Sequence, residues 1–241
     1  MVASLSSLSL LLAVAVNAGL APASNPLRKI YAAGSGLDML SQPDTVSEII
    51  SLSGKAAPKV LYIGTATYDT AAARDTQTKS FIAQGCTIAD LDVALSAPST
   101  DAMAAQVRAA DVILVSGGNT LFAVDRWVKV GLDTLLHDAL NNGTVLCGGS
   151  AGGIVWFDGG HSDSMESPSY KNPPGPFLRP NPSKAELANW AYIRVPGVSV
   201  VPGLFCPHYD VTEGNGVLRS SDFTGMLERH SGEYGIGVDN W

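Results

Sequence analysis

Short apolar runs rich in valine and isoleucine alternate with helical patterns along most of this sequence, and this alternation constrains the fold more than any other feature. Apolar runs without polar interruption indicate strands whose two faces are both covered. Strands that alternate with helices form a parallel sheet. The sequence therefore predicts an α/β fold, a mostly parallel sheet with helices on both faces, whose strands include residues 29–33, 60–64, 87–93, 112–116 and 144–147.

The ends of the connecting helices are marked by capping residues. Asp44 is expected to cap a helix over 45–52 that Gly54 ends. Asn119 is expected to cap a later helix, which Gly131 interrupts. These signals support helical crossovers between parallel strands.

The second half of the sequence follows a different pattern. Residues 167–183 contain six prolines, which exclude a helix or an inner strand and predict a long surface loop. An apolar run at 198–205 predicts one more strand, and a helix is expected around 223–227. The whole of 25–241 is expected to form one domain, which is an ordinary size for an α/β fold.

Charge and cysteine content narrow the partners of this domain. The net charge of -7 argues against nucleic acid and anionic membranes, so a small substrate is expected. Cys86, Cys147 and Cys206 show no metal-type spacing, and we predict neither a disulfide framework, a metal site nor a cofactor. The oligomeric state stays open, a homodimer included.

Residues 1–24 are almost uncharged and contain an apolar run at 10–16 that is too short to span a bilayer. The run and the small residues after it are typical of a signal peptide, whereas the absence of Lys or Arg before it is not. We therefore expect either a secreted protein with a cleaved signal peptide or a cytoplasmic protein with a poorly ordered leader.

The most informative motif lies at residues 144–155, where a predicted strand, a sharp turn and a helix follow one another. Gly148 to Gly152 satisfies the G-x-S-x-G pattern of a nucleophile elbow, which predicts Ser150 as a nucleophile. Glycines beside the serine permit the cramped turn, and the new helix directs free N–H groups at an oxyanion. The alternative is a glycine-rich connection or a phosphate loop.

A second glycine turn, at 116–120, follows the preceding strand. In a parallel sheet the two turns are neighbours at the carboxyl ends of the strands. The backbone N–H groups of Gly118 and Ala151 are therefore predicted to form an oxyanion hole. Asn119 is predicted to cap its helix while facing the substrate cleft, although capping alone explains its presence.

A serine nucleophile needs a base, and His208 is the predicted one because it directly follows the strand at 198–205. His137 lies in the last turns of a helix, where the helix dipole explains it, and His230 is expected to be solvated. The carboxylate that orients the base is left open by spacing. The candidates are Asp158, Asp163, Glu166 and Asp210, of which we choose Asp163 because it lies in a polar stretch able to fold back over the site.

These motifs resemble those of the S51 peptidases, the family of peptidase E and cyanophycinase. The resemblance runs from Lys29 to Asn240 and rests on residues 116–120, 149–152, 160–165 and 206–209. It implies a sheet similar to flavodoxin and to class I glutamine amidotransferases, a serine nucleophile, a histidine base and no metal. It also implies that Arg219 meets an acidic substrate side chain, although a surface helix position would explain this arginine as well.

The sequence departs from the family at two places. In peptidase E an aspartate precedes the methionine after the elbow helix, whereas Ser164 precedes Met165 here and the acid is one place earlier. Family members usually continue past the strand at 235–239, whereas this sequence ends at Trp241. We therefore expect a hydrolase of small peptides, including dipeptides with an N-terminal aspartate, with an inactive S51-like protein or a non-catalytic phosphate or nucleotide binder as alternatives.

Overall fold

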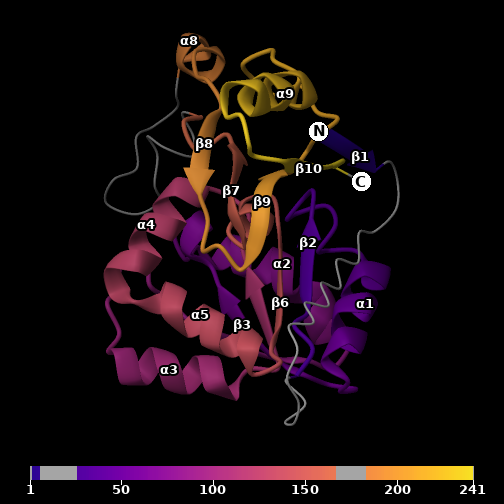
Figure 1. Cartoon of the computed structure of the whole chain (residues 1–241). Helices are drawn as coiled ribbons and strands as arrows, with labels where there is room; N and C mark the ends of the chain where they lie inside the picture. The colour runs from indigo at the N-terminus through magenta and orange to yellow at the C-terminus, as the bar shows by residue number, and fades with distance from the viewer. Residues whose placement is uncertain (1, 6–25, 167–182, 241) are drawn as a thin grey trace.

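The computed structural model describes residues 2–5, 26–166 and 183–240, which form two five-stranded sheets flanked by helices (Figure 1). The first sheet is parallel throughout, as predicted. Its strands in spatial order are β2 (Ile30–Ala33), β6 (Val145–Gly149), β5 (Val112–Val115), β3 (Lys59–Ile63) and β4 (Thr87–Asp90). The predicted α/β fold is confirmed.

Helices cover both faces of the first sheet (Figure 1). Successive strand residues point to opposite faces, so Leu61 and Ile63 pack with one helical layer and Val60 and Tyr62 with the other. One layer contains α3 (Thr100–Ala109), α4 (Thr120–Val130) and α5 (Leu132–Asn141). The other contains α1 (Pro43–Ser53) and α2 (Ala71–Ala83), and a 3-10 turn, η1 (Thr65–Thr67), follows β3.

The second sheet is mostly parallel and contains the end of the chain. Its order is β1 (Val2–Leu5), β10 (Gly235–Val238), β9 (Val201–Cys206), β7 (Phe157–Ser162) and β8 (Ile193–Pro196). Only the pairing of β8 with β7 is antiparallel among the described pairs. The helix α9 (Arg219–Arg229) packs on this sheet through Phe223, while α8 (Lys184–Ala188) precedes β8.

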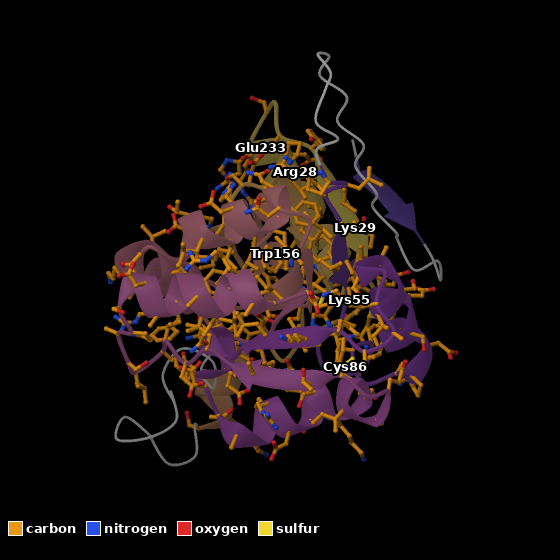
Figure 2. The ribbon with its side chains drawn as sticks, turned by 90° about the horizontal axis from the view of Figure 1, so that it is seen from below. Arg28, Lys29, Lys55, Cys86, Trp156 and Glu233 are labelled. Carbon is orange, nitrogen blue, oxygen red and sulfur yellow. The ribbon has the colours of Figure 1, made fainter. Side chains whose placement is uncertain are left out.

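The two sheets share a core around the short helix α6 (Ala151–Ile154). Trp156 is fully buried and lies near the middle of the molecule (Figure 2). The rings of Phe157 and Phe205 stack at 4.8 Å, and Gly153 on α6 lies directly against Phe205. This shared core brings the end of the first sheet close to the strands of the second.

Several boundaries differ from the sequence-based expectations. Asp44 lies inside the first turn of α1, because the helix starts at Pro43, two residues earlier than expected, and Gln42 is the N-cap. The run predicted as one strand at 198–205 contains a turn at Ser199, with φ of 55°, and the strand starts at Val201. This strand belongs to the second sheet, whereas the sequence predicted a single sheet.

Two of the predicted segments fall largely outside the described residues. These are the proline-rich loop at 167–182 and most of the leader, of which Val2–Leu5 pairs in parallel with β10. Within the described ranges, no helix has both the length and the apolar character needed to cross a membrane.

Candidate active site

Ser150 lies in a backbone conformation that ordinary residues avoid. Its φ and ψ angles are 55° and −122°, and it separates the last residue of β6 from the first residue of α6. A side chain at Gly148 would overlap the carbonyl of Gly152, and one at Gly149 would overlap the carbonyl of Ser35. Close backbone contacts therefore require the glycines around Ser150, as expected for a nucleophile elbow.

The second glycine turn lies beside this serine. The backbone N–H of Ser150 donates to the carbonyl of Ala33 at 3.1 Å, and a Cβ added to Gly117 would lie 3.5 Å from the Cβ of Ser150. Gly118 has a φ of 114°, which favours glycine. Ala151 is the first residue of α6, where backbone N–H groups have no partner within the helix. The two predicted oxyanion donors thus belong to the two turns that meet at the serine.

Asn119 is buried, and both ends of its amide are engaged within the protein. Its Oδ1 accepts from the backbone N–H of Phe122 at 3.0 Å, which confirms the predicted cap of α4. Its Nδ2 donates to the hydroxyl of Tyr68 at 3.0 Å, and the Tyr68 ring packs on Phe122. Asn119 therefore ties α4 to the turn after β3, and its contact with substrate stays a prediction.

His208 lies two residues beyond the end of β9 and has a left-handed backbone conformation, with φ of 49°. Its Nδ1 is hydrogen-bonded to Oδ1 of Asn240, two residues beyond β10. The Nδ2 of Asn240 donates to Oδ2 of Asp38 at 3.1 Å, and the hydroxyl of Ser35 donates to the same oxygen at 3.2 Å. This chain of hydrogen bonds from the histidine ends at Ser35, whose carbonyl packs against Gly149 in the glycine turn of the serine.

The surroundings of His208 favour the neutral imidazole. Burial lowers its pKa, and the positive charge of Arg219 lowers it further. The hydrogen bond to Asn240 and the carboxylates of Asp163 and Glu213 raise the pKa, but their effects are smaller. His208 therefore remains able to accept a proton at lower pH than an exposed histidine would.

Asp163, the predicted third member of a triad, has a different partner in the structure. Its Oδ2 accepts from Nη1 of Arg219 at 2.9 Å, whereas the described partner of the His208 Nδ1 is Asn240. A buried guanidinium needs a carboxylate in direct contact. Asp163, the residue after the end of β7, is the carboxylate that lies against Arg219. The assignment of Asp163 as the carboxylate on the base is thus corrected.

Arg219 also departs from its expected role. Its side chain is 0% exposed, and its guanidinium is held by Asp163, by Glu213 at 3.5 Å and by the backbone carbonyl of His161 at 3.0 Å. The ring of Tyr192 covers it at 5.0 Å. Contact with an acidic substrate side chain would require an exposed guanidinium, whereas this one is buried, with both Nη atoms bonded within the protein and Nε without a partner among the described residues.

His161 forms a histidine–carboxylate pair that sequence reasoning missed. Its Nε2 lies 2.9 Å from Oδ1 of Asp222, and its ring packs against Tyr192 and Phe223. Burial and then Arg219 lower its pKa. The side chain is 0% exposed, so a substrate cannot reach it. The two partners are 61 residues apart, and no local pattern could have joined them.

The two remaining histidines have structural surroundings. His137 on α5 contacts the carbonyl of Val198. His230 ends α9, and its side chain is 45% exposed and 3.9 Å from Glu233, as expected for a solvated residue.

The three cysteines are buried and free, and burial raises the pKa of Cys206 to about 12. Thiols of this kind remain protonated and are poor nucleophiles at neutral pH. Among the residues that the structure describes, no three His, Cys, Asp or Glu side chains are grouped to hold a metal ion.

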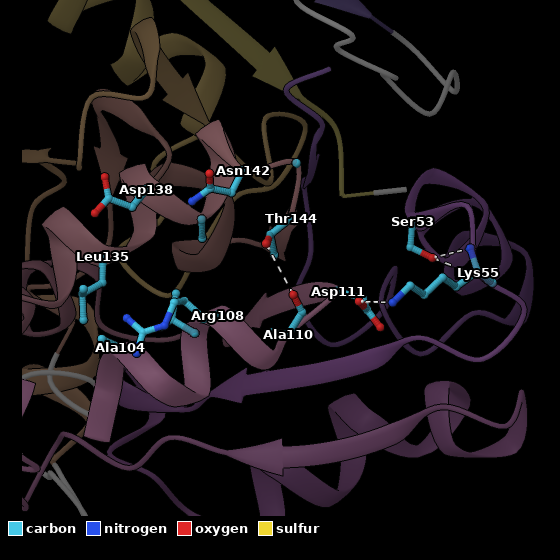
Figure 3. A pocket seen from close by; sticks show the side chains of 13 residues that line it. Ser53, Lys55, Ala104, Arg108, Ala110, Asp111, Leu135, Asp138, Asn142 and Thr144 are labelled. Atoms are coloured by element: carbon cyan, nitrogen blue, oxygen red, sulfur yellow. Dashed lines mark hydrogen bonds and ion pairs between the residues drawn. The ribbon is translucent and has the colours of Figure 1, made fainter. Parts of the chain in front are cut away.

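A cavity of about 580 Å³ lies at the opposite end of the first sheet (Figure 3). Its lining includes Lys55, Asp111 and Thr144, which precede β3, β5 and β6, and Lys55 is ion-paired with Asp111 at 2.6 Å. Ser150 follows the carboxyl end of β6, so the length of that strand separates the cavity from the serine. The candidate active site is therefore formed by the turns around Ser150 and is separate from this cavity.

The family is decided by a comparison with models of protein families, in which peptidase family S51 matches residues 30–241. The chain belongs to peptidase family S51. It is therefore a serine peptidase of the peptidase E-like type, a hydrolase. The resemblance noted from the glycine turns and the residues around His208 is confirmed.

Curated relatives of this S51 peptidase span most of its sequence. A Trypanosoma brucei brucei protein named G2/mitotic-specific cyclin-1 is 32% identical over 86% of this chain and 68% of its own length. An uncharacterized peptidase of Bacillus subtilis, YgaJ, is 30% identical over 76% of this chain and 70% of its own length.

Solved structures agree on the fold of this S51 peptidase. One is a putative peptidase E from Listeria monocytogenes EGD-e, with a TM-score of 0.57 and 18% sequence identity. The match covers 88% of this chain and 90% of the Listeria chain. Another is a peptidase from an acI-B1 actinobacterium, with a TM-score of 0.59 and 16% sequence identity. The match covers 87% of this chain and 79% of the actinobacterial chain. These likenesses support the flavodoxin-like α/β arrangement.

Proposed function

We propose that this S51 peptidase hydrolyses short peptides through an acyl-enzyme, with Ser150 as nucleophile and His208 as base. The observation that carries the proposal is the conformation of Ser150, with φ of 55° at the end of a parallel strand and glycines packed around it. Strained backbone of this kind costs about 1–3 kcal/mol, persists only where the surrounding structure imposes it, and is frequent at active sites. His208 shares the feature, with φ of 49°.

In the proposed reaction the imidazole Nε2 of His208 takes the hydroxyl proton of Ser150 as the serine oxygen attacks the peptide carbonyl. The amine then leaves with a proton returned by the imidazolium. Water, activated by the same imidazole, hydrolyses the ester and releases the carboxylic acid. The backbone N–H groups of Gly118 and Ala151 are the proposed donors to the oxyanion, because they flank the serine on both glycine turns.

Short peptides are the proposed substrates, and the buried state of Arg219 bears on their selection. An arginine that is paired with Asp163 and Glu213 offers no free charge to an aspartyl side chain. We therefore propose peptide hydrolysis without assigning acidic selectivity to Arg219. Dipeptides with an N-terminal aspartate belong in the substrate panel beside neutral and basic ones.

The test compares wild-type protein with Ser150→Ala on a panel of dipeptides and aminoacyl p-nitroanilides. Loss of the nucleophile is expected to lower kcat by on the order of 10⁴ or more, because the acyl-enzyme can no longer form. A serine-directed phosphonate is expected to label the wild type at Ser150 and to leave the variant unlabelled.

Ser47→Ala serves as the matched control, because this exposed serine lies on α1, on the outer face of the first sheet. It is expected to keep wild-type activity and labelling. Equal turnover by wild type and Ser150→Ala would contradict the proposal. Absence of both turnover and labelling in the wild type would indicate an inactive relative of the family.

A further inference from the structure

The partner of His208 is an amide whose orientation is determined by a second hydrogen bond. Asp38 Oδ2 lies 3.1 Å from the terminal nitrogen of Asn240, and a carboxylate can only accept. The Nδ2 group of Asn240 therefore points at Asp38, and Oδ1 points at the imidazole. Since Oδ1 can only accept, the Nδ1 of His208 must carry the proton in this bond.

This arrangement fixes the tautomer of the imidazole. With the proton on Nδ1, Nε2 of neutral His208 keeps a free lone pair. That lone pair is what a general base needs in order to accept the hydroxyl proton of a serine. A flipped amide would present Nδ2 to the ring instead, and the proton would be forced onto Nε2.

We propose that Asp38 and Asn240 form a positioning relay for His208, in which the carboxylate acts through an intervening amide instead of touching the imidazole. The inference rests on the proposed function of His208 as base. Asn240 takes the place next to the ring, and Asp38 fixes which end of the amide faces it.

The relay is held in place from several sides. The backbone N–H of Asn240 donates to Oδ1 of Asp210 at 2.8 Å, and the backbone N–H of Tyr209 donates to the carbonyl of Val238 at 3.0 Å. The backbone N–H of Asp38 donates to the hydroxyl of Ser35 at 3.0 Å. The amide thus has little freedom to turn away from the histidine.

The relay also sets the charge environment of the base. The charged groups that act on His208 are Arg219 from α9, Asp163 after β7 and Glu213 in the turn before α9, with Asp38 acting through the amide. When His208 takes the serine proton, the imidazolium faces the carbonyl dipole of Asn240 rather than a full negative charge. The base is therefore weaker than one in direct contact with a carboxylate and stays unprotonated to lower pH.

The sharpest experiment exchanges the two relay residues in the double variant Asp38→Asn, Asn240→Asp. The net charge is unchanged and one donor still faces one carboxylate, but the negative charge moves next to the imidazole. We expect the acidic limb of the kcat/KM profile to move up by about 1 pH unit or more, because a direct opposite charge raises the histidine pKa by 1–3 units.

Asp38→Asn alone removes the carboxylate that fixes the amide. We expect kcat to fall by roughly 2- to 10-fold with KM within a few fold, because only the fraction of molecules that holds His208 in the right tautomer can act. Asn141→Asp is the matched control: it makes the same substitution as Asn240→Asp at an exposed site, next to Arg28. It is expected to keep the wild-type profile.

A readout independent of turnover separates this inference from the proposed function. In protein labelled with ¹⁵N-histidine, NMR is expected to show His208 protonated at Nδ1 in the wild type, mixed in Asp38→Asn, and titrating at higher pH in the double variant. Wild-type spectra and pH limbs in both variants would overturn the relay. Relay-dependent NMR shifts in a protein whose Ser150→Ala variant retains full activity would instead refute the serine mechanism and retain the contact.

Discussion

Two histidines of this peptidase each have a side-chain partner of the kind found in active sites, yet their surroundings differ. His161 is paired with a carboxylate, Asp222, but its side chain is 0% exposed and packed between aromatic rings. His208 is paired with an amide, Asn240, and follows a strand end in a strained backbone conformation. The pair with the better partner for catalysis is the one that substrate cannot reach.

The proposed role of His208 therefore rests on access and position and not on the identity of its partner. His161 has its Nδ1 buried without a hydrogen-bond partner among the described residues, and its Nε2 is already bound to Asp222. It has no free atom that faces solvent. His208 is connected by hydrogen bonds to Ser35, which packs against Gly149 in the turn of Ser150. A histidine–carboxylate pair is therefore not by itself the mark of the proposed base.

The largest effect expected from this comparison is on turnover. His208→Ala is expected to lower kcat/KM by about 10³–10⁴, since removal of the base leaves only binding and oxyanion stabilisation. His161→Ala is expected to change kcat/KM by less than tenfold per folded molecule. Steady-state kinetics on the best peptide of the panel, with the folded fraction measured by circular dichroism, provides the check.

The reverse ranking, with His161→Ala inactive while folded and His208→Ala active, would break the comparison and make His161 the functional histidine.

The second effect is on stability and its pH dependence. His161→Ala is expected to lower the free energy of unfolding by about 2–4 kcal/mol through lost aromatic packing. Because the pKa of His161 is lowered in the folded state, the unfolded chain binds the proton first. Wild-type stability should therefore fall as the pH decreases below about 6.5, the ordinary pKa of histidine. Urea unfolding at pH 7.5, 6.5 and 5.5 measures this slope.

The slope should be smaller in His161→Ala and unchanged in His230→Ala, whose histidine is exposed. An identical slope in wild type and His161→Ala would show that other groups govern acid destabilisation.

The smallest effect concerns a buried carboxyl outside both histidine pairs. Burial raises the pKa of Asp69 to about 6, and its Oδ2 accepts from the backbone N–H of Ala94 at 2.7 Å. Because the folded-state pKa is raised, stability is lost as the pH increases from about 4 to above 6. Asp69→Asn keeps an acceptor for Ala94 and suits the φ of 56°, so we expect a gain of about 1 kcal/mol at pH 8 and little change at pH 4.

Urea unfolding at the two pH values is again the measurement. A loss of stability for Asp69→Asn at pH 8 would mean that the charged carboxylate is needed where it lies.

Much of this architecture could be predicted from local signals. The five strands of the first sheet, the cap at Asn119 and the elbow at Ser150 depend on residues close in sequence, whose patterns are set by burial and backbone geometry. His208 could be chosen because it follows an apolar run. The glycines were informative because only they fit the close backbone contacts of the turns.

The partners of these residues could not be predicted in the same way. Asn240 lies 32 positions from His208, and the group expected next to a base is a carboxylate, so no signal in the sequence pointed to an amide. Arg219 gave no sign of being buried, because the position of α9 over the second sheet depends on packing between distant segments. Its burial in turn determines where Asp163 points.

The close backbone packing around Ser150 limits how the substrate selectivity of this protein can change. A methyl group at Gly34 would overlap the carbonyl of Asp239, and methyl groups at Gly148, Gly149 or Gly152 would overlap other backbone atoms. Substitution of these glycines would displace the backbone that positions Ser150. A change of substrate preference, whether by evolution or by engineering, is therefore expected from side chains outside these glycine turns.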